Sequence, residues 1–211
     1  ARLIIHDQIN FDDYCTKIGL ADFLEIANLS GLIHDKFSLS RLESCVHCKG
    51  NKLSINKKEA NKISDNPYER IAQIIANVLR EKLLLEGKKI SFETVFSHKG
   101  KIDFIRKAKS QGYKVYLYFV STESVKINIY RVKTVRVGKN GHDVPKQKII
   151  DRYYRSMDYL FEAAQYCYQA YFFDNSAENV KHKLFAHFKV DGNGAKKWTI
   201  PDENFIPNWF N

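Results

Sequence analysis

The heptapeptide KVYLYFV at residues 114–120 decides the fold class of this chain. Its β-branched and aromatic side chains predict a strand at the centre of a sheet. The segments around it alternate between two periodicities, with strand patterns at 89–92, 170–173 and 184–190 and helix patterns at 99–111, 125–137 and 146–169. This alternation predicts an α/β fold in which helices flank a parallel sheet.

Upstream of this region, the sequence predicts one long helix with defined ends. The start of the helix is marked by Asn66, Pro67 and Glu69. Asn can cap the helix, Pro suits its first turn, and Glu can hydrogen-bond back to the cap residue, as in a capping box. Gly87 follows the last apolar residue of the pattern and predicts the helix end.

The remaining parts of the chain have weaker patterns. Short helices and polar loops are predicted before residue 65, with an exposed excursion over 44–64 that is rich in Lys, Asn and Ser. The predicted division is a helical and irregular insertion over 1–65, a kinase-like α/β core over 66–190 and a C-terminal tail over 191–211.

The composition excludes several classes of protein. The chain has 211 residues, of which 44% are hydrophobic and 13% aromatic, so a disordered class is excluded. No apolar run approaches the roughly 18 residues of a membrane helix, and no signal segment follows Ala1. Four cysteines are too few for a disulfide scaffold of this length. We expect a cytoplasmic protein without a membrane partner.

The net charge of +10 is concentrated in one part of the chain. Residues 101–155 hold fourteen basic and four acidic side chains, so the rest of the sequence is neutral overall. A patch of this sign predicts an anionic partner, such as a phosphate, a nucleotide or a nucleic acid.

Polar side chains follow three of the predicted strands at their carboxyl ends, where ligands bind in sheets of this class. They are Glu93 and Thr94, residues 121–123 and residues 174–176. A carboxylate beside a hydroxyl at such an edge suits Mg²⁺ or a sugar hydroxyl. The alternative, that Glu93 only caps a turn, stays open at this point.

Basic residues gather on the two predicted helices that flank the polar loop GKNGHDVP at 138–145. Arg131 and Arg136 precede the loop, and Arg152 and Arg155 follow it. Two helices joined by such a loop predict a lid over 125–156 that places arginines over a triphosphate, because the guanidinium fork matches phosphate oxygens. The alternative is a solvated helical face, which the scarcity of acidic neighbours disfavours.

Other motifs have weaker support. The segment Cys45-Val46-His47-Cys48 lacks a second pair at zinc spacing, so no metal site is predicted. An RNA-binding sheet needs aromatic and basic residues interleaved on one exposed face, and the aromatic residues here are interpreted as core. The segment GNGAKK at 192–197 has neither the spacing nor the hydroxyl of a phosphate loop, and G-x-x-x-x-G-K-[ST] does not occur.

The middle of the chain resembles a known enzyme family. The segments that carry the resemblance are ISFETVFSHKGKIDFIRKAKSQGYKVYLYFVSTE at 90–123, NIYRVKTVRV at 128–137, NGHDVPKQKIIDRYYRS at 140–156 and YFFDNS at 171–176. Their order and spacing are similar to the zeta-toxin group of P-loop kinases, and more closely to its branch named predicted ABC-type ATPase in bacterial genomes.

The resemblance implies a P-loop kinase fold and an enzyme that uses ATP and Mg²⁺ to phosphorylate a small-molecule hydroxyl. Known members act as toxins on UDP-activated amino sugars, so a UDP-sugar substrate and an antitoxin protein are the implied partners, ahead of nucleic acid. Glu93 matches the acidic residue that serves substrate or Mg²⁺, and Thr94 accompanies it at the substrate.

The resemblance also implies which residues bind the nucleotide. Arg131 and Arg136 match the lid arginines that meet the ATP phosphates. His142 and Arg152 belong to the same lid motif, although a lone loop histidine is more often solvated than catalytic. Asp174 and Asn175 match a loop that borders the nucleotide base, in the order Asp-Asn-Ser.

Two departures from the family bear on these expectations. The phosphate loop and a strand with an acidic base should precede Ala1, so the chain is either a fragment, which its non-Met start favours, or a degenerate member without ATP binding. We expect no kinase activity from these residues alone. One extra residue separates Arg131 from the NGH motif, so either Val135 is an insertion or the helix carries a bulge.

Two other classes of function compete with the kinase. The first is a basic nucleic-acid-binding protein that uses the patch at 101–155, with binding that weakens steeply with salt. The second is a degenerate, non-catalytic interaction protein that is held by its partner through residues 1–65.

Overall fold

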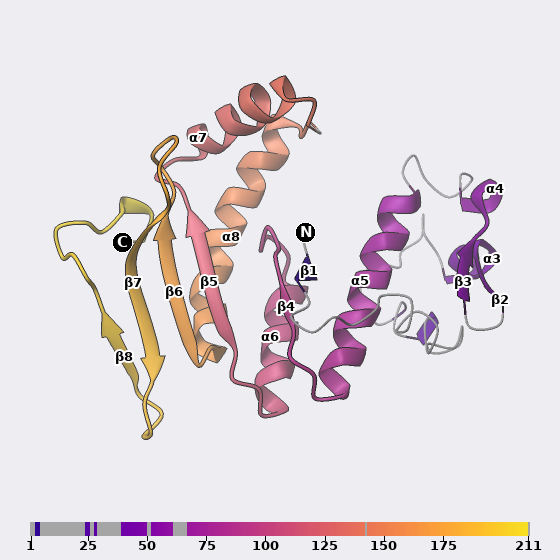
Figure 1. The fold of residues 1–211 in the computed structure, drawn as a ribbon, viewed down its shortest axis with the longest axis horizontal. Coiled ribbons are helices and arrows are strands. Elements are labelled where there is room, and N and C mark those ends of the chain that lie inside the picture. The colour runs from indigo at the N-terminus through magenta and orange to yellow at the C-terminus, as the bar shows by residue number, and fades with distance from the viewer. Residues whose placement is uncertain are drawn as a thin grey trace. The chain divides into compact units, whose positions relative to one another are not determined.

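A computed structural model of the chain has two compact units, Ala1–Thr94 (unit 1) and Val95–Asn211 (unit 2), and each is described by itself. The structure describes residues 3–4, 24–25, 28, 39–49, 52–60, 67–141 and 143–210. Figure 1 shows their helices and strands. The predicted division at residues 65 and 190 stays a prediction.

The described residues of unit 1 form helices and two short antiparallel strand pairs. Its elements include β1 (Leu3–Ile4), α3 (Leu39–Cys45), β2 (Val46–Lys49), β3 (Lys52–Ile55), α4 (Lys57–Ala60), α5 (Pro67–Leu85) and β4 (Ser91–Phe92). β1 pairs with β4, and β2 pairs with β3. Cys45 and Val46 are buried where α3 meets β2. The stretch 44–64 is therefore not wholly an exposed excursion, because its first residues pack inside.

The long helix α5 has the predicted ends. It spans Pro67–Leu85, and Gly87 follows with a φ of +70°, a conformation that favours glycine. Ile74, on the predicted inner face, is buried. The predicted cap, Asn66, lies outside the described residues.

Unit 2 is a sheet with helices packed on one face. Its elements are α6 (Gly100–Ser110), β5 (Tyr116–Ser121), α7 (Val125–Tyr130), η1 (Arg131–Arg136), α8 (Lys146–Tyr166), β6 (Gln169–Asp174), β7 (Lys183–Val190), β8 (Lys196–Thr199) and η2 (Asn208–Phe210). The strand order is β5-β6-β7-β8. The predicted α/β class is confirmed.

The sheet is mixed, which corrects the predicted parallel sheet. β5 and β6 are parallel, whereas β6–β7 and β7–β8 are antiparallel. Only eight residues join β6 to β7, and a parallel return needs a crossover of about a dozen residues. β5, predicted as central, stands at one end of the strand order among the residues that the structure describes.

Residues 191–211, predicted as a tail, contribute to this unit. They supply β8, which pairs with β7. They also supply Trp209 and Phe210, whose rings pack edge-on against Phe185 at centroid distances of 5.4 and 5.0 Å. Aromatic contacts of this kind add to the free energy gained by burying the rings.

The two faces of the sheet differ in character. One face packs against α6 and α8 and forms a core that includes Ile102, Ile105, Phe119, Leu160, Ala163, Phe172, Phe185 and Phe188. On the other face, Tyr116, Tyr118 and Val120 of β5 are 50%, 63% and 48% exposed. The interpretation of the strand aromatics as core is therefore wrong for these two tyrosines, because alternate residues of a strand point to opposite faces.

The predicted helix over 125–137 consists of two elements. α7 ends at Tyr130, and the next six residues, Arg131–Arg136, form the π-helix η1. A π-helix widens the turn, so this part of the helix does carry a bulge. An extra residue relative to the family stays a prediction. Ser124 caps α7, since its Oγ accepts the Lys126 backbone N–H at 3.2 Å.

Candidate functional site

The ends of β5 and β6 meet in one hydrogen-bonded group of residues, 121–123 and 174–176, which we call the strand-end cluster. The backbone N–H of Asn175 donates to the Ser121 carbonyl at 2.7 Å. The backbone N–H of Glu123 donates to Ser176 Oγ at 2.7 Å, and that hydroxyl donates to Asp174 Oδ1 at 2.7 Å. Two of the three predicted places at strand ends are thus joined, because parallel neighbours end at the same edge.

Asp174 is the buried acid of this cluster, with 9% of its surface exposed. Its carboxylate accepts from the Ser176 backbone N–H at 3.1 Å, in addition to the Ser176 hydroxyl. It also accepts from Trp209 Nε1 at 3.4 Å. The carboxylate therefore holds the C-terminal η2 helix against the end of β6.

A cleft of about 410 Å³ opens beside the strand-end cluster. It is lined by Glu123, Ser124, Val125, Tyr153, Tyr154, Met157, Asn208 and Trp209. Glu123 Oε1 accepts from the backbone N–H of Asn208 at 3.2 Å and from its side-chain amide. Aromatic walls with a few polar groups suit a planar ligand that carries hydrogen-bonding edges, such as a nucleobase.

Tyr153 connects the cleft wall to the end of β5. Its hydroxyl donates to the Thr122 carbonyl at 2.8 Å. Burial, and secondarily the negative charge of Glu123, raises the pKa of Tyr153 above its ordinary value. The hydroxyl therefore stays protonated at neutral pH and remains a donor.

Arg131, predicted as a phosphate ligand, contacts the loop that follows β6. Its guanidinium donates to the carbonyls of Asn175 at 2.7 Å, Ala177 at 3.0 Å and Ser176 at 3.4 Å. The side chain thus joins η1 to the end of the sheet. A role for it against phosphates stays a prediction.

Within the lid, residues 125–156, the π-helix η1 contacts the polar loop at 138–145. Lys133 Nζ lies 2.8 Å from Asp143 Oδ1. The Gly141 N–H donates to the Arg136 carbonyl at 2.8 Å. An added Cβ on Gly141 would stand 2.7 Å from that oxygen, so only glycine fits here. Asn140, the residue before it, has a φ of +59°.

Replacing Gly141 with alanine is therefore expected to displace Arg136 and to loosen the lid. We expect a loss of about 1–2 kcal/mol in the free energy of opening of residues 131–141, by the cost of overpacking. Amide hydrogen exchange across η1 measures it. Gly138→Ala is the matched control, because nothing lies within 4 Å of a Cβ there. Equal protection in both variants would contradict the close approach.

The other predicted site residues lie in three places. Arg136 is exposed at the end of η1, and Arg152 is half-buried on α8. His142 lies outside the described residues. Glu93 is exposed and Thr94 half-buried, and both belong to unit 1, so the structure does not join them to the strand-end cluster.

Three cleft residues, Tyr153, Asn208 and Trp209, were missed by reasoning from the sequence. Tyr153 fits the inner face of a long helix and was interpreted as core. Asn208 lies 85 residues after its hydrogen-bond partner Glu123, and Trp209 lies 35 residues after its partner Asp174. The aromatic segment IPNWF was the only signal of a packed C-terminus.

The described residues contain neither a metal-binding cluster nor a membrane-spanning helix. Across the part of the chain that the structure describes, no group of three His, Cys, Asp or Glu side chains is arranged to hold a metal ion. None of the helices described has the length and apolar character needed to cross a membrane. Comparison with family models, curated proteins and solved structures gives no match. The zeta-toxin family stays a prediction that rests on the motifs quoted above.

Proposed function

We propose that this chain is the lid-bearing part of an ATP-dependent phosphotransferase of the zeta-toxin type, which acts in the cytoplasm on a hydroxyl of a nucleotide sugar or a similar metabolite. The observation that carries the proposal is the strand-end cluster, which borders a cleft at the base of a basic lid. The P-loop kinase fold and an antitoxin partner follow from the same resemblance and are part of the proposal.

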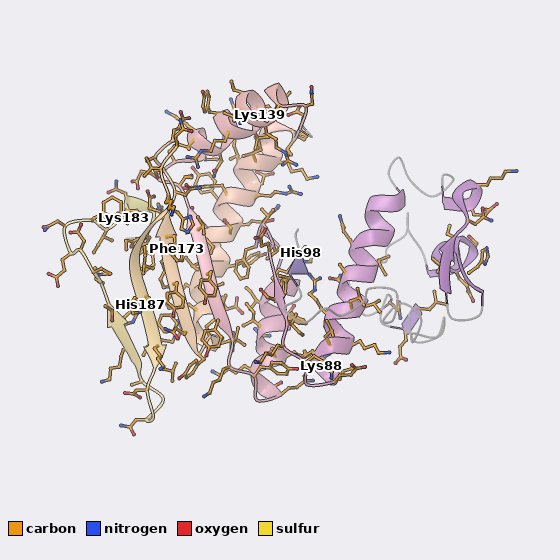
Figure 2. The ribbon with its side chains drawn as sticks, viewed as in Figure 1. Lys88, His98, Lys139, Phe173, Lys183 and His187 are labelled. Carbon is orange, nitrogen blue, oxygen red and sulfur yellow. The ribbon has the colours of Figure 1, made fainter. Side chains whose placement is uncertain are left out.

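The charge of the lid supports an anionic ligand. Residues 125–156 hold nine basic and two acidic side chains, and one of those acids, Asp143, is paired with Lys133. Lys139 lies in the polar loop of the lid, at the top of the view in Figure 2, and Arg136 is exposed. These cations lie next to a cleft and strongly outnumber their acidic neighbours. They therefore attract phosphate groups.

The cleft suits the base of a nucleotide. Tyr153 and Trp209 bring aromatic rings to its lining. Glu123 and Asn208, which are hydrogen-bonded to each other, bring polar groups. In the proposed complex the base would lie against these rings, and Arg136 and Arg152 would bind phosphate oxygens.

The residues do not supply a full site for ATP with Mg²⁺. No G-x-x-x-x-G-K-[ST] occurs in the sequence, and the Asp174 carboxylate is bonded to Ser176 and Trp209. Each missing phosphate donor is worth on the order of 3 kcal/mol in a transition state. We therefore propose that these 211 residues bind a nucleotide weakly and transfer no phosphate by themselves.

Binding of an ATP analogue labelled with N-methylanthraniloyl tests the proposal, through energy transfer from tryptophan. Trp209 lines the cleft, so bound analogue is expected to quench its emission. Arg136→Ala and Arg152→Ala should each weaken binding about 5-fold, the loss of one exposed charge-assisted hydrogen bond. Arg106→Ala, on α6 and outside the lid, removes the same charge and should leave affinity within about 2-fold.

Two results would overturn parts of this proposal. Equal affinities in all three arginine variants would show that the lid does not contact the nucleotide. Transfer of labelled phosphate from ATP to a UDP-sugar by the wild-type chain would show that the missing phosphate loop is not needed. A gene that encodes G-x-x-x-x-G-K-[ST] before Ala1 provides the longer protein in which transfer should be measured.

A further inference from the structure

The face of the sheet opposite α6 and α8 carries three rows of side chains that run across the strands. We call it the open face. The residues directly opposite one another form an aromatic row of Tyr118, Tyr171, His187 and Thr199, a basic row of Tyr116, Gln169, Lys189 and Lys197, and an apolar row of Val120, Phe173 and Leu184. Figure 2 labels Phe173 and His187 on the neighbouring strands β6 and β7. None of these positions is acidic.

The rings of the aromatic row stack on one another across the strands, and the row ends at Tyr118 on β5. Tyr118 and Tyr171 are stacked, with their centroids 4.9 Å apart and their planes at 8°. The His187 ring continues the row at 5.6 Å from Tyr171, tilted by 31°. Tyr118 is 63% exposed. Tyr116 and Val120 lie on either side of it on the same face and are 50% and 48% exposed, and contiguous apolar surface of this kind marks interaction sites.

The basic row lies two residues along the strands from the aromatic row, a distance of about 7 Å. Lys189 and Lys197 stand directly opposite each other, and like charges in that position destabilise a sheet. Lys197 has a carboxylate, Asp191 Oδ2, at 3.7 Å. Lys114 and Lys189 also lie near the Tyr168 ring, at 5.0 and 5.8 Å from its centroid. An anion bound along this row would offset the repulsion between the two lysines.

Unit 2 as a whole is positively charged, as is the open face. Unit 2 holds twenty basic and eleven acidic residues, and so carries +9 of the net charge of +10. A chain of phosphates would meet a favourable field as it approaches, and the field would weaken with added salt.

We propose that the open face binds single-stranded RNA, with a base stacked on the exposed ring of Tyr118, which ends the aromatic row, and phosphates along the basic row. Exposed strand aromatics beside cations are the means by which sheets bind unpaired bases. A duplex hides its base faces, so it could use only the lysines. Tyrosine hydroxyls beside the rings can pair with the ribose 2′-hydroxyl, which is both donor and acceptor. The surface is independent of the proposed kinase function, whose cleft lies at the carboxyl edge of the sheet.

The test is fluorescence anisotropy of a labelled RNA of about 12 nucleotides, within the range that one such surface covers, with the full chain at low salt. Tyr118→Ala should weaken binding about ten-fold or more, the usual effect of removing the ring under one stacked base. Lys189→Glu should weaken binding and should reduce the slope of log affinity against log salt by about 0.7 for each phosphate that is no longer bound. The competing ligands are DNA of the same sequence, an RNA duplex and an acidic peptide. The single-stranded RNA should bind most tightly of the four.

Matched controls keep the result interpretable. Phe161→Ala removes an aromatic ring that is 77% exposed on α8, and Lys107→Glu reverses a charge on α6; both helices cover the opposite face. Both should bind RNA as the wild type does, and circular dichroism should show all four variants folded.

Unchanged affinity in a folded Tyr118→Ala protein would overturn the proposal, as would an equal loss of affinity in Phe161→Ala. Tighter binding of duplex, DNA or acidic peptide than of the RNA would also overturn it. An excess of ATP should not displace the RNA, which separates this surface from the cleft.

Discussion

Replacing Arg131 with methionine is expected to lower the free energy of unfolding of unit 2 by about 2–3 kcal/mol. The guanidinium donates to three carbonyls in the loop after β6, at 2.7, 3.0 and 3.4 Å. Hydrogen bonds from a charged group contribute about 1.5–3 kcal/mol, and methionine would leave the carbonyls without this donor. Both tryptophans of the chain, Trp198 and Trp209, belong to unit 2, so urea unfolding followed by their fluorescence reports on this unit.

The control for this prediction is Arg155→Met, an equal change at an exposed position of the same lid. It should change stability by less than about 0.5 kcal/mol. Arg131→Lys should recover only part of the loss, because an ammonium cannot span the carbonyls as the planar fork does. If Arg131→Met and Arg155→Met unfold at the same urea concentration, the contacts of Arg131 do not stabilise the unit.

This prediction also changes how the activity of an Arg131 variant should be interpreted. The resemblance implies that Arg131 meets phosphate, so a loss of nucleotide binding in the variant could be assigned to the wrong cause. Arg136 and Arg152 are the better probes of the lid, since the contacts that hold the loop after β6 are made by Arg131.

Replacing Asp174 with alanine is expected to lower the free energy of unfolding of unit 2 by about 3 kcal/mol. Its buried carboxylate accepts the backbone N–H and the hydroxyl of Ser176 and the indole N–H of Trp209. Each buried donor left without an acceptor costs about 1–3 kcal/mol, and some of these would find water once the site opens. The same urea unfolding measures the loss, and the emission of Trp209 should shift as its partner disappears.

Asp158→Ala, on the exposed side of α8, is the matched control and should be nearly neutral. Asp174→Asn keeps the shape and one acceptor oxygen, so it should lose about half as much as alanine. A folded Asp174→Ala protein with wild-type stability and unchanged tryptophan emission would contradict a structural role and would favour a ligand for this carboxylate.

The elements with strong local signals could be predicted from the sequence. α5 has a proline start and a glycine end, and its limits agree with the structure. The apolar periodicity of α6 and α8 and the aromatic run of β5 likewise have their expected types. These signals are local, because they depend on backbone preference and on the burial of one face.

The parts that could not be predicted depend on register and on distant contacts. β8 is four residues long and mostly exposed, so no alternation marks it. The open face joins Tyr118, Tyr171 and His187 only because three strands pair in one register, and a shift by one residue would move each to the other face. Trp209 reaches Asp174 through the packing of the C-terminus, and no pattern near either residue indicates that contact.

The wide turn at Arg131–Arg136 has a consequence for how this protein can vary. A residue gained or lost in an α-helix normally rotates everything beyond it by about 100°. In η1 the wider turns hold a surplus residue within Arg131–Arg136. A change of one residue in the length of this segment is therefore expected to disturb its surroundings less than the same change within the regular turns of α8.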